Sequence, residues 1–120
     1  AAVAGAVREA QRAAIAALVP GAKAADVDAG ARAVLRRGGW DACFGHALGH
    51  GVGLQIHESP RLSGSSKAIL REGMAVTVEP GVYIPGWGGV RIEDTVLVTS
   101  RGGKVLPRTE RDDDDRIGLV

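Results

Sequence analysis

The fold class is decided by the stretch Met74-Ala-Val-Thr-Val-Glu-Pro-Gly-Val-Tyr-Ile84, in which apolar and β-branched residues dominate. A second stretch of the same texture, residues 89–100, follows a cluster of turn residues. Such runs between turn signals are typical of strands. The connections between them are too short for helical crossovers, so we expect mostly antiparallel strands near 47–56, 74–84, 89–100 and 104–106.

The first third of the chain has a helical period instead. Apolar residues recur at steps of three and four within 3–18 and again within 27–35. Pro20 follows the first set and Gly38 the second, and both residues end helices. The sequence therefore predicts an αα-hairpin followed by a β half, which is an α+β fold, with a further short helical turn at 67–71. We expect the polar residues of the first helix to lie on its other faces: Arg8, Gln11 and Arg12.

Composition excludes several classes of protein. The 15 basic and 14 acidic residues are interspersed and give a formal net charge of +1, so no basic stripe for nucleic acid is present. No segment approaches the roughly 20 apolar residues that a membrane span requires. Cys43 is the single cysteine, as expected for a reducing compartment, and we expect a cytoplasmic protein.

The length of 120 residues fits one domain or part of one. Four consecutive aspartates, Asp112 to Asp115, repel one another and favour a solvated segment. We therefore expect a folded unit over 1–110 and an acidic, flexible tail over 111–120.

All three histidines lie in one segment, Gly45-His46-Ala-Leu-Gly-His50-Gly-Val-Gly-Leu-Gln-Ile-His57-Glu58. A single histidine is more often a packed side chain than a ligand, but three histidines among glycines indicate that something approaches the backbone closely. His46 and His50 are spaced as in a helical zinc pair, yet the glycines disfavour a helix. On an extended strand these two share a face, whereas His57 needs a bend to join them.

Glu79 and Glu93 are carboxylates inside otherwise apolar strand patterns. A buried carboxylate is normally paired or bound to a metal. A structural ion pair between Arg91 and Glu93 is one explanation. The other is a metal site, since one imidazole and two carboxylates form a ligand set for zinc, manganese or cobalt. Three protein ligands would leave a position open for a nucleophilic water.

Three segments resemble motifs of one family, in the same order and at compatible spacings. They are Gly49-His50-Gly-Val-Gly-Leu-Gln-Ile-His57-Glu58, Val78-Glu79-Pro80-Gly81-Val-Tyr83 and Gly89-Val-Arg91-Ile-Glu93-Asp94. The family is the pita-bread metallopeptidases, which include methionine aminopeptidase, aminopeptidase P and prolidase. The resemblance runs nearly end to end and implies the C-terminal half of that fold, an αα-hairpin packed on a mostly antiparallel sheet.

The resemblance also implies roles for six side chains. His50, Glu79 and Glu93 would be metal ligands, with Glu79 also accepting the proton of the attacking water. His57 would stabilise the tetrahedral intermediate. His46 and Arg91 resemble accessory residues of the branch that cleaves Xaa-Pro bonds, so the expected substrate is a peptide with proline after the scissile bond.

The family's site holds two divalent ions, expected here to be manganese, cobalt or zinc, and also uses two aspartates from a hairpin ahead of the first helix. This sequence has no such hairpin, so the isolated chain is expected to bind metal weakly and to lack full activity. The half that is absent from this chain would cover part of the sheet, and a homodimer is one way to replace it. A non-catalytic module that binds peptides or a partner is the alternative within the same fold. A purely structural domain ranks last.

Overall fold

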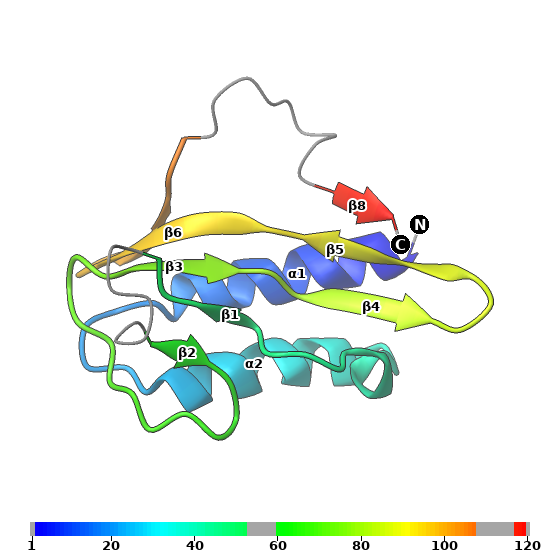
Figure 1. Ribbon diagram of the computed structural model, residues 1–120, viewed down its shortest axis with the longest axis horizontal. Coiled ribbons are helices and arrows are strands. Elements are labelled where there is room, and N and C mark those ends of the chain that lie inside the picture. Colours follow the sequence, from blue (N-terminus) through cyan, green and yellow to red (C-terminus); the bar gives the residue numbers. More distant parts are fainter. Residues whose placement is uncertain (1, 53–59, 108–116, 120) are drawn as a thin grey trace.

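The computed structural model describes residues 2–52, 60–107 and 117–119, the last three without their side chains (Figure 1). Two helices come first, α1 (Ala2–Ala16) and α2 (Ala24–Arg37), followed by a short 3₁₀ helix, Asp41–Cys43. The predicted αα-hairpin is confirmed. Asp26 in the first turn of α2 and the two arginines of its last turn suit the helix dipole.

In the described part of the β half there are eight short strands, and the pairs that they form are antiparallel. They form three small sheets, with strand orders β1-β2, β3-β6-β7 and β4-β5-β8. The bounds are β1 Gly49–His50, β2 Arg61–Leu62, β3 Ala75–Val78, β4 Gly81–Ile84, β5 Gly88–Ile92, β6 Asp94–Thr99, β7 Gly102–Val105 and β8 Ile117–Leu119. The α+β class with antiparallel pairing agrees with the prediction.

The two long predicted strands are each broken in the middle. Residues 74–84 divide into β3 and β4 at Glu79 and Pro80, and residues 89–100 divide into β5 and β6 at Glu93. Proline has no N–H to donate to a sheet ladder, which explains the first break. Continuous strands were therefore the wrong prediction at the two carboxylates of interest.

The predicted helical turn at 67–71 is also wrong. This segment is extended, because it pairs with the chain that enters α2: Ile69 bridges Lys23, and the N–H of Leu70 donates to the carbonyl of Ala22 at 2.8 Å. Three residues of the predicted tail, Ile117–Leu119, belong to a sheet, since β8 pairs with β5.

The core lies between the helices and the strands. In Figure 1, α1 runs along β3, β4 and β5, while α2 lies next to β2. Completely buried leucines and valines from both halves meet there, among them Leu18, Leu35, Leu48, Val76, Val82 and Val96. Burying one such side chain contributes about 1.5–3 kcal/mol. In the part of the chain that the structure describes, neither helix is long and apolar enough to cross a membrane.

Candidate metal centre

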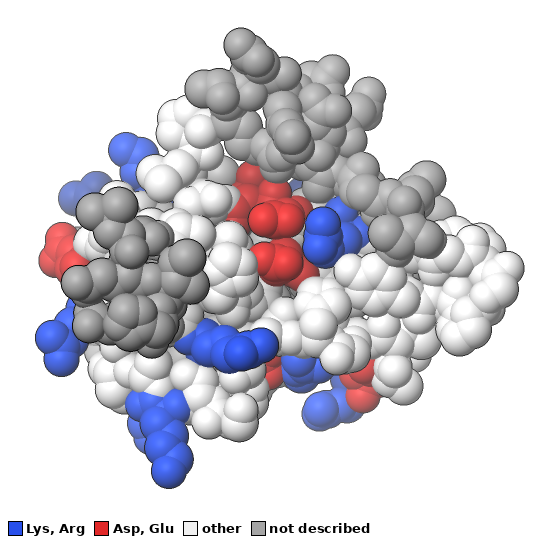
Figure 2. Space-filling view, in the orientation of Figure 1, with Lys and Arg blue, Asp and Glu red and all other residues white. Residues whose placement is uncertain are grey.

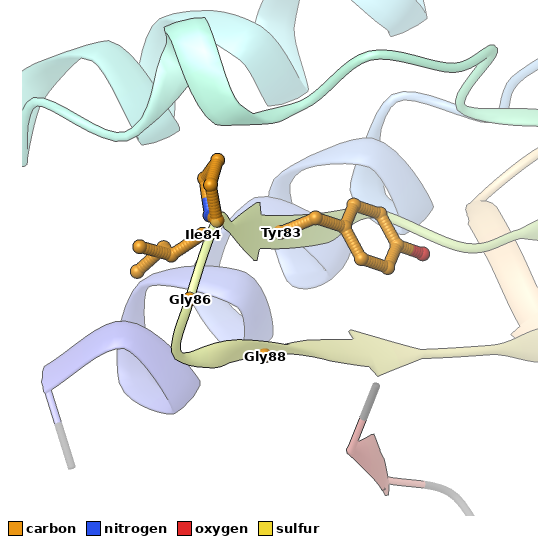
Figure 3. Close-up of a pocket in the computed structure, with 5 residues that line it drawn as sticks. Tyr83, Ile84, Gly86 and Gly88 are labelled. Carbon is orange, nitrogen blue, oxygen red and sulfur yellow. The ribbon is translucent and has the colours of Figure 1, made fainter.

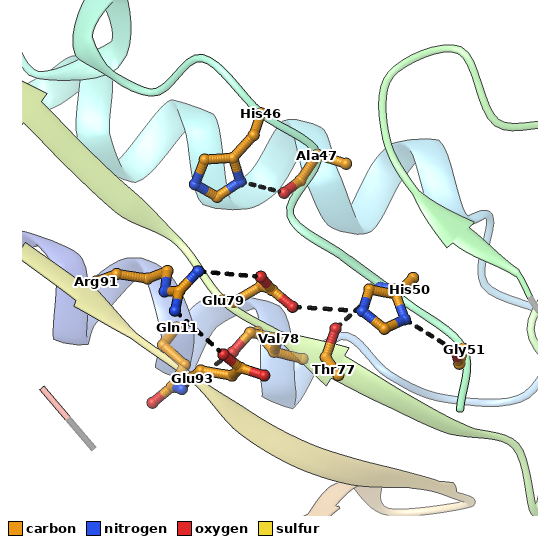
Figure 4. Close-up of polar contacts among 10 residues, drawn as sticks. All are labelled: Gln11, His46, Ala47, His50, Gly51, Thr77, Val78, Glu79, Arg91 and Glu93. Atoms are coloured by element: carbon orange, nitrogen blue, oxygen red, sulfur yellow. Dashed lines mark hydrogen bonds and ion pairs between the residues drawn. The ribbon is translucent and has the colours of Figure 1, made fainter. Parts of the chain in front are cut away.

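The two strand breaks lie opposite each other. Val78 pairs with Asp94 on one side of the breaks, and Gly81 pairs with Arg91 on the other. Between these pairs the N–H of Ile92 donates to the carbonyl of Pro80 at 3.2 Å. Glu79 and Glu93 are therefore brought to the same place from positions 14 residues apart in the sequence (Figure 4).

The histidine segment runs beside the first break. The N–H of Glu79 donates to the carbonyl of Leu48 at 2.7 Å, and the N–H of Val52 donates to the carbonyl of Ala75 at 2.9 Å. The approach is so close that a Cβ on Gly49 would lie 1.8 Å from the carbonyl oxygen of Thr77. This residue must be glycine for His50 to reach Glu79.

His50 is held in one orientation by two hydrogen bonds. Its backbone N–H donates to Oγ1 of Thr77 at 3.0 Å, and its ring Nδ1 lies 2.9 Å from the carbonyl oxygen of Gly51. A carbonyl oxygen only accepts, so Nδ1 carries the hydrogen and Nε2 has a free lone pair when the ring is neutral. Nε2 lies 3.7 Å from Oε2 of Glu79. Donation of the second ring nitrogen to a carbonyl is the usual arrangement of a metal-binding histidine.

Arg91 lies between the two carboxylates. Its guanidinium nitrogens are 3.8 Å from Oε1 of Glu79 and 3.7 Å from Oε1 of Glu93. The side chain of Glu79 is 15% exposed, so its charge needs compensation from a cation. The ion pair predicted as the structural explanation is thus present. Figure 2 shows acidic side chains with a basic side chain beside them near the centre of this face.

The side chains of the three predicted ligands do not converge on one point. His50 faces Glu79 directly, whereas Glu93 is linked to Glu79 through Arg91. Among the described residues, no three His, Cys, Asp or Glu side chains are grouped closely enough to hold a metal ion. The donor set nevertheless fits a divalent metal, because the imidazole presents its lone pair toward a carboxylate. His57 lies outside the described residues.

In Figure 4, His46 lies above Glu79, whereas His50 lies to its right. The Nδ1 of His46 is 2.6 Å from the carbonyl oxygen of Ala47, so Nδ1 carries the hydrogen here too. Its Nε2 is buried and has no hydrogen-bond partner among the described residues. The ring packs edge-on against Phe44 and Tyr83, with centroids 4.8 Å and 5.5 Å away.

Sequence reasoning missed the support of the histidine segment by α2. Arg32 donates to Oδ2 of Asp28 at 2.8 Å and to the carbonyl oxygens of Phe44 and His46 at 3.0 Å and 2.6 Å. Its guanidinium also lies over the ring of Phe44, 4.2 Å from the centroid. The spacing of Asp28 and Arg32, four residues apart on a helix, was the signal available in the sequence.

A second missed residue is Gln11, which we expected to lie on a polar face of the first helix. Its side chain is instead buried against the strand breaks, where it donates to the carbonyl oxygen of Val78. Tyr83 was also missed as a neighbour of His46. Its position four residues after Glu79 was the available signal.

Tyr83 also lines a pocket of about 350 Å³ at the tip of the β4–β5 hairpin, together with Ile84, Pro85, Gly86 and Gly88 (Figure 3). None of the predicted metal ligands contributes to this pocket. The candidate site is therefore the group of charged residues around the strand breaks and not the hairpin tip.

The sequence pattern of metallopeptidase family M24 matches residues 1–100. The chain is 53% identical over 106 residues to an Xaa-Pro dipeptidase of Pyrococcus furiosus, which covers 88% of this chain and 30% of the relative. Among solved structures, prolidase from Pyrococcus furiosus is similar with a TM-score of 0.84 and 51% identity, over 92% of this chain and 33% of that one.

An X-Pro aminopeptidase from Thermotoga maritima is similar with a TM-score of 0.81 and 39% identity, over 90% of this chain and 32% of that one. The chain thus spans about a third of the length of these relatives. With the match over residues 1–100, the chain belongs to metallopeptidase family M24, and its αα-hairpin and antiparallel sheets form part of a pita-bread fold.

Proposed function

We propose that the complete protein hydrolyses Xaa-Pro peptide bonds and that residues 1–110 supply the C-terminal half of its catalytic domain. The observation that carries this proposal is the orientation of His50, whose Nε2 lone pair is directed toward Glu79. The names of two relatives, an Xaa-Pro dipeptidase and an X-Pro aminopeptidase, support the substrate class.

His50, Glu79 and Glu93 would hold a divalent metal, manganese, cobalt or zinc, in a two-ion site completed by two aspartates outside this chain. The bound metal would supply Lewis acidity that makes a water molecule nucleophilic near neutral pH. The mixed nitrogen and oxygen donors of this set suit each of these ions.

The other roles follow from position and chemistry. Glu79 would accept the proton of the attacking water, and its low exposure favours proton transfer away from bulk solvent. His46 and Arg91 would contact the peptide, and the buried, unpartnered Nε2 of His46 supports this role within the described residues. His57, outside the described residues, would stabilise the tetrahedral intermediate.

The test is Glu93→Gln in the complete protein, with metal content measured by elemental analysis and cleavage measured on an Xaa-Pro dipeptide and on a longer peptide. We expect loss of cleavage of both peptides and metal affinity about 100-fold weaker. Glu72→Gln is the matched control, because Glu72 is an exposed carboxylate outside the site. Retained metal and activity in the Glu93 variant would contradict the ligand assignment.

A non-catalytic module that binds peptides or a partner is the second candidate. The observation in its favour is that Arg91 is within ion-pair distance of both carboxylates, so these charges are compensated without a metal. Cobalt titration of the unsubstituted complete protein separates the two candidates. Binding supports the peptidase, and absence of binding supports the module.

We also propose that the isolated chain forms homodimers and that the protein is cytoplasmic. Exposed apolar side chains support self-association, among them Val52, Ile69, Trp87 and Val105. A half-buried free thiol at Cys43 supports a reducing compartment. Light scattering should give the mass of a dimer, and a monomer at high concentration would contradict the first proposal.

A further inference from the structure

Gln11 is a polar residue on the buried face of α1, and the residue is only 6% exposed. A buried amide costs free energy unless it is hydrogen-bonded. Its Nε2 lies 3.3 Å from the carbonyl oxygen of Val78, 3.5 Å from that of Ile92 and 3.2 Å from Oδ2 of Asp94. One amide group therefore reaches β3 through Val78 and β5 through Ile92.

The acceptors of this amide are placed at the two breaks. Val78 directly precedes Glu79, and Ile92 directly precedes Glu93. Sheet pairing stops at both positions, so the backbone groups there need partners from elsewhere. Gln11 provides two N–H groups for three nearby acceptors, and it thereby replaces ladder hydrogen bonds that the breaks remove.

The opposite side of the first break is fixed by the histidine segment, because the N–H of Glu79 donates to the carbonyl of Leu48 at 2.7 Å. The peptide unit that joins Val78 to Glu79 is thus held at both ends, by Gln11 at its carbonyl and by Leu48 at its N–H. A peptide unit fixed at both ends determines the direction in which the next side chain leaves the backbone.

We propose that Gln11 is a positioning residue that fixes the directions of Glu79 and Glu93 and so the geometry of the metal site. The inference rests on the proposed function for its metal-binding part. Gln11 acts through the backbone on which the two carboxylates are mounted, because its amide donates to the carbonyl oxygens of Val78 and Ile92. Figure 4 shows it beneath the strands, on the side away from His50.

The experiment compares Gln11→Met with Val7→Ala in the complete protein. Gln11→Met removes the amide donors and keeps an unbranched side chain of similar length. Val7 lies one turn earlier on the same helix and is fully buried, so Val7→Ala loosens the same interface without removing a polar contact. The loss of Tm in each variant is recorded as the measure of general destabilisation.

Two readouts follow. Hydrogen–deuterium exchange on metal-free protein, measured on peptides that cover 76–82 and 90–95, reports on the breaks without any metal. Titration with Co²⁺ reports on the ligands. In Gln11→Met we expect exchange at both breaks about tenfold faster and Co²⁺ affinity about tenfold weaker, as for other residues that orient metal ligands, while Val7→Ala changes either by less than about twofold.

Each outcome decides the inference. Exchange and affinity that change in both variants in proportion to Tm would overturn it, because Gln11 would then be a packing residue. Faster exchange at the breaks with unchanged Co²⁺ affinity would overturn the positioning of ligands. If the unsubstituted protein binds no Co²⁺, the proposed function fails, and the exchange data alone decide whether Gln11 fixes the two carboxylates.

Discussion

The two helices support the site by different means. On α1, a neutral amide, Gln11, lies in the core and donates directly to the backbone at the strand breaks. On α2, a buried carboxylate, Asp28, holds Arg32. The guanidinium of Arg32 donates to the carbonyl oxygens of Phe44 and His46. A neutral donor adds no charge next to the carboxylates, whereas the ion pair lies at the partly exposed edge of the fold, where Arg32 is 28% exposed.

The site therefore has two parts with different supports. The carboxylate half, residues 75–99, is held by α1, and the histidine half, residues 44–52, is held by α2. The two halves meet at Gly49. A neutral buried support should be sensitive to the loss of its donor and little affected by salt, while a support built on an ion pair should be sensitive to the loss of either charge.

The largest effect is expected from Gly49→Ala, which separates the two halves. The new Cβ would lie 1.8 Å from the carbonyl oxygen of Thr77, so the histidine segment must move away. We expect a loss of about 3 kcal/mol in the free energy of unfolding, the upper part of the usual range for overpacking, together with loss of Co²⁺ binding. Urea unfolding and Co²⁺ titration measure these changes.

Gly45→Ala is the control for this substitution, because a Cβ on Gly45 meets nothing within 4 Å and its φ is not positive. Its expected effect is below about 1 kcal/mol, since a surface substitution without a clash changes stability little. If the two variants were equally stable, the close contact between the halves would not be required.

The next effect should come from Arg32→Met, which breaks the support of the histidine half. It leaves Asp28, 1% exposed, without its guanidinium partner. Loss of one partner of a buried pair costs 3–5 kcal/mol, and because Arg32 is partly exposed we expect about 2 kcal/mol. The carbonyl of His46 also loses its donor. Under the proposed function, KM of the complete protein for Xaa-Pro peptides should therefore rise more than kcat falls.

Arg36→Met is the matched control on the same helix, since Arg36 pairs with Asp41 at 3.4 Å on the surface. It should change stability by less than about 0.5 kcal/mol. Adding Asp28→Asn to the Arg32 variant removes the buried charge and should restore part of the stability. Equal losses in the Arg32 and Arg36 variants would show that the buried carboxylate is not costly.

Thr77→Val should have a smaller effect, confined to the hydrogen bond between the halves. It removes the acceptor of the His50 N–H and keeps the shape of a buried side chain. The expected loss is about 1 kcal/mol in the free energy of unfolding. Thr77→Ser retains the hydroxyl and should keep more of the Co²⁺ affinity than Thr77→Val. The reverse order would mean that the methyl group and not the hydroxyl matters.

The smallest effect is expected from Glu9→Gln, which removes an exposed ion pair between the helices. Glu9 lies 3.8 Å from Arg37, and both side chains are mostly exposed. The change in stability should stay below about 0.5 kcal/mol and disappear at high salt. Thermal unfolding at two salt concentrations measures this change. A loss larger than that of Thr77→Val would contradict the conclusion that buried contacts, and not surface ion pairs, stabilise this part of the fold.

Much of the fold was predictable because it depends on local patterns. The period of apolar residues determines both helices, and the short connections require antiparallel pairing. The break at Glu79 is marked in the sequence by Pro80, but the partner of the Glu79 N–H is Leu48, 31 residues earlier, and alternation could not reveal it. The segment 67–71 was mispredicted for the same reason, since its pairing partner precedes α2.

The candidate site was predictable in its charged residues and not in their support. His50, Glu79, Arg91 and Glu93 stand out in sequence as polar residues among apolar ones, and the structure places them in a chain of close contacts, with His50 facing Glu79 and Arg91 between the two carboxylates. Gln11 and Arg32 look like ordinary polar helix residues. Their importance comes from contacts with Val78 and His46, which no helical period reveals.

The pairing of β8 with β5 has a consequence for how this protein can be handled. β5 leads into Glu93, and β8 lies along the side of it that β4 does not cover. A chain shortened before Ile117 would expose the backbone N–H and C=O groups of that side, and open strand edges of this kind recruit strands from other molecules. Trimming the C-terminus, a routine step toward crystals, is therefore expected to cause aggregation through β5, the strand that leads into the predicted ligand Glu93.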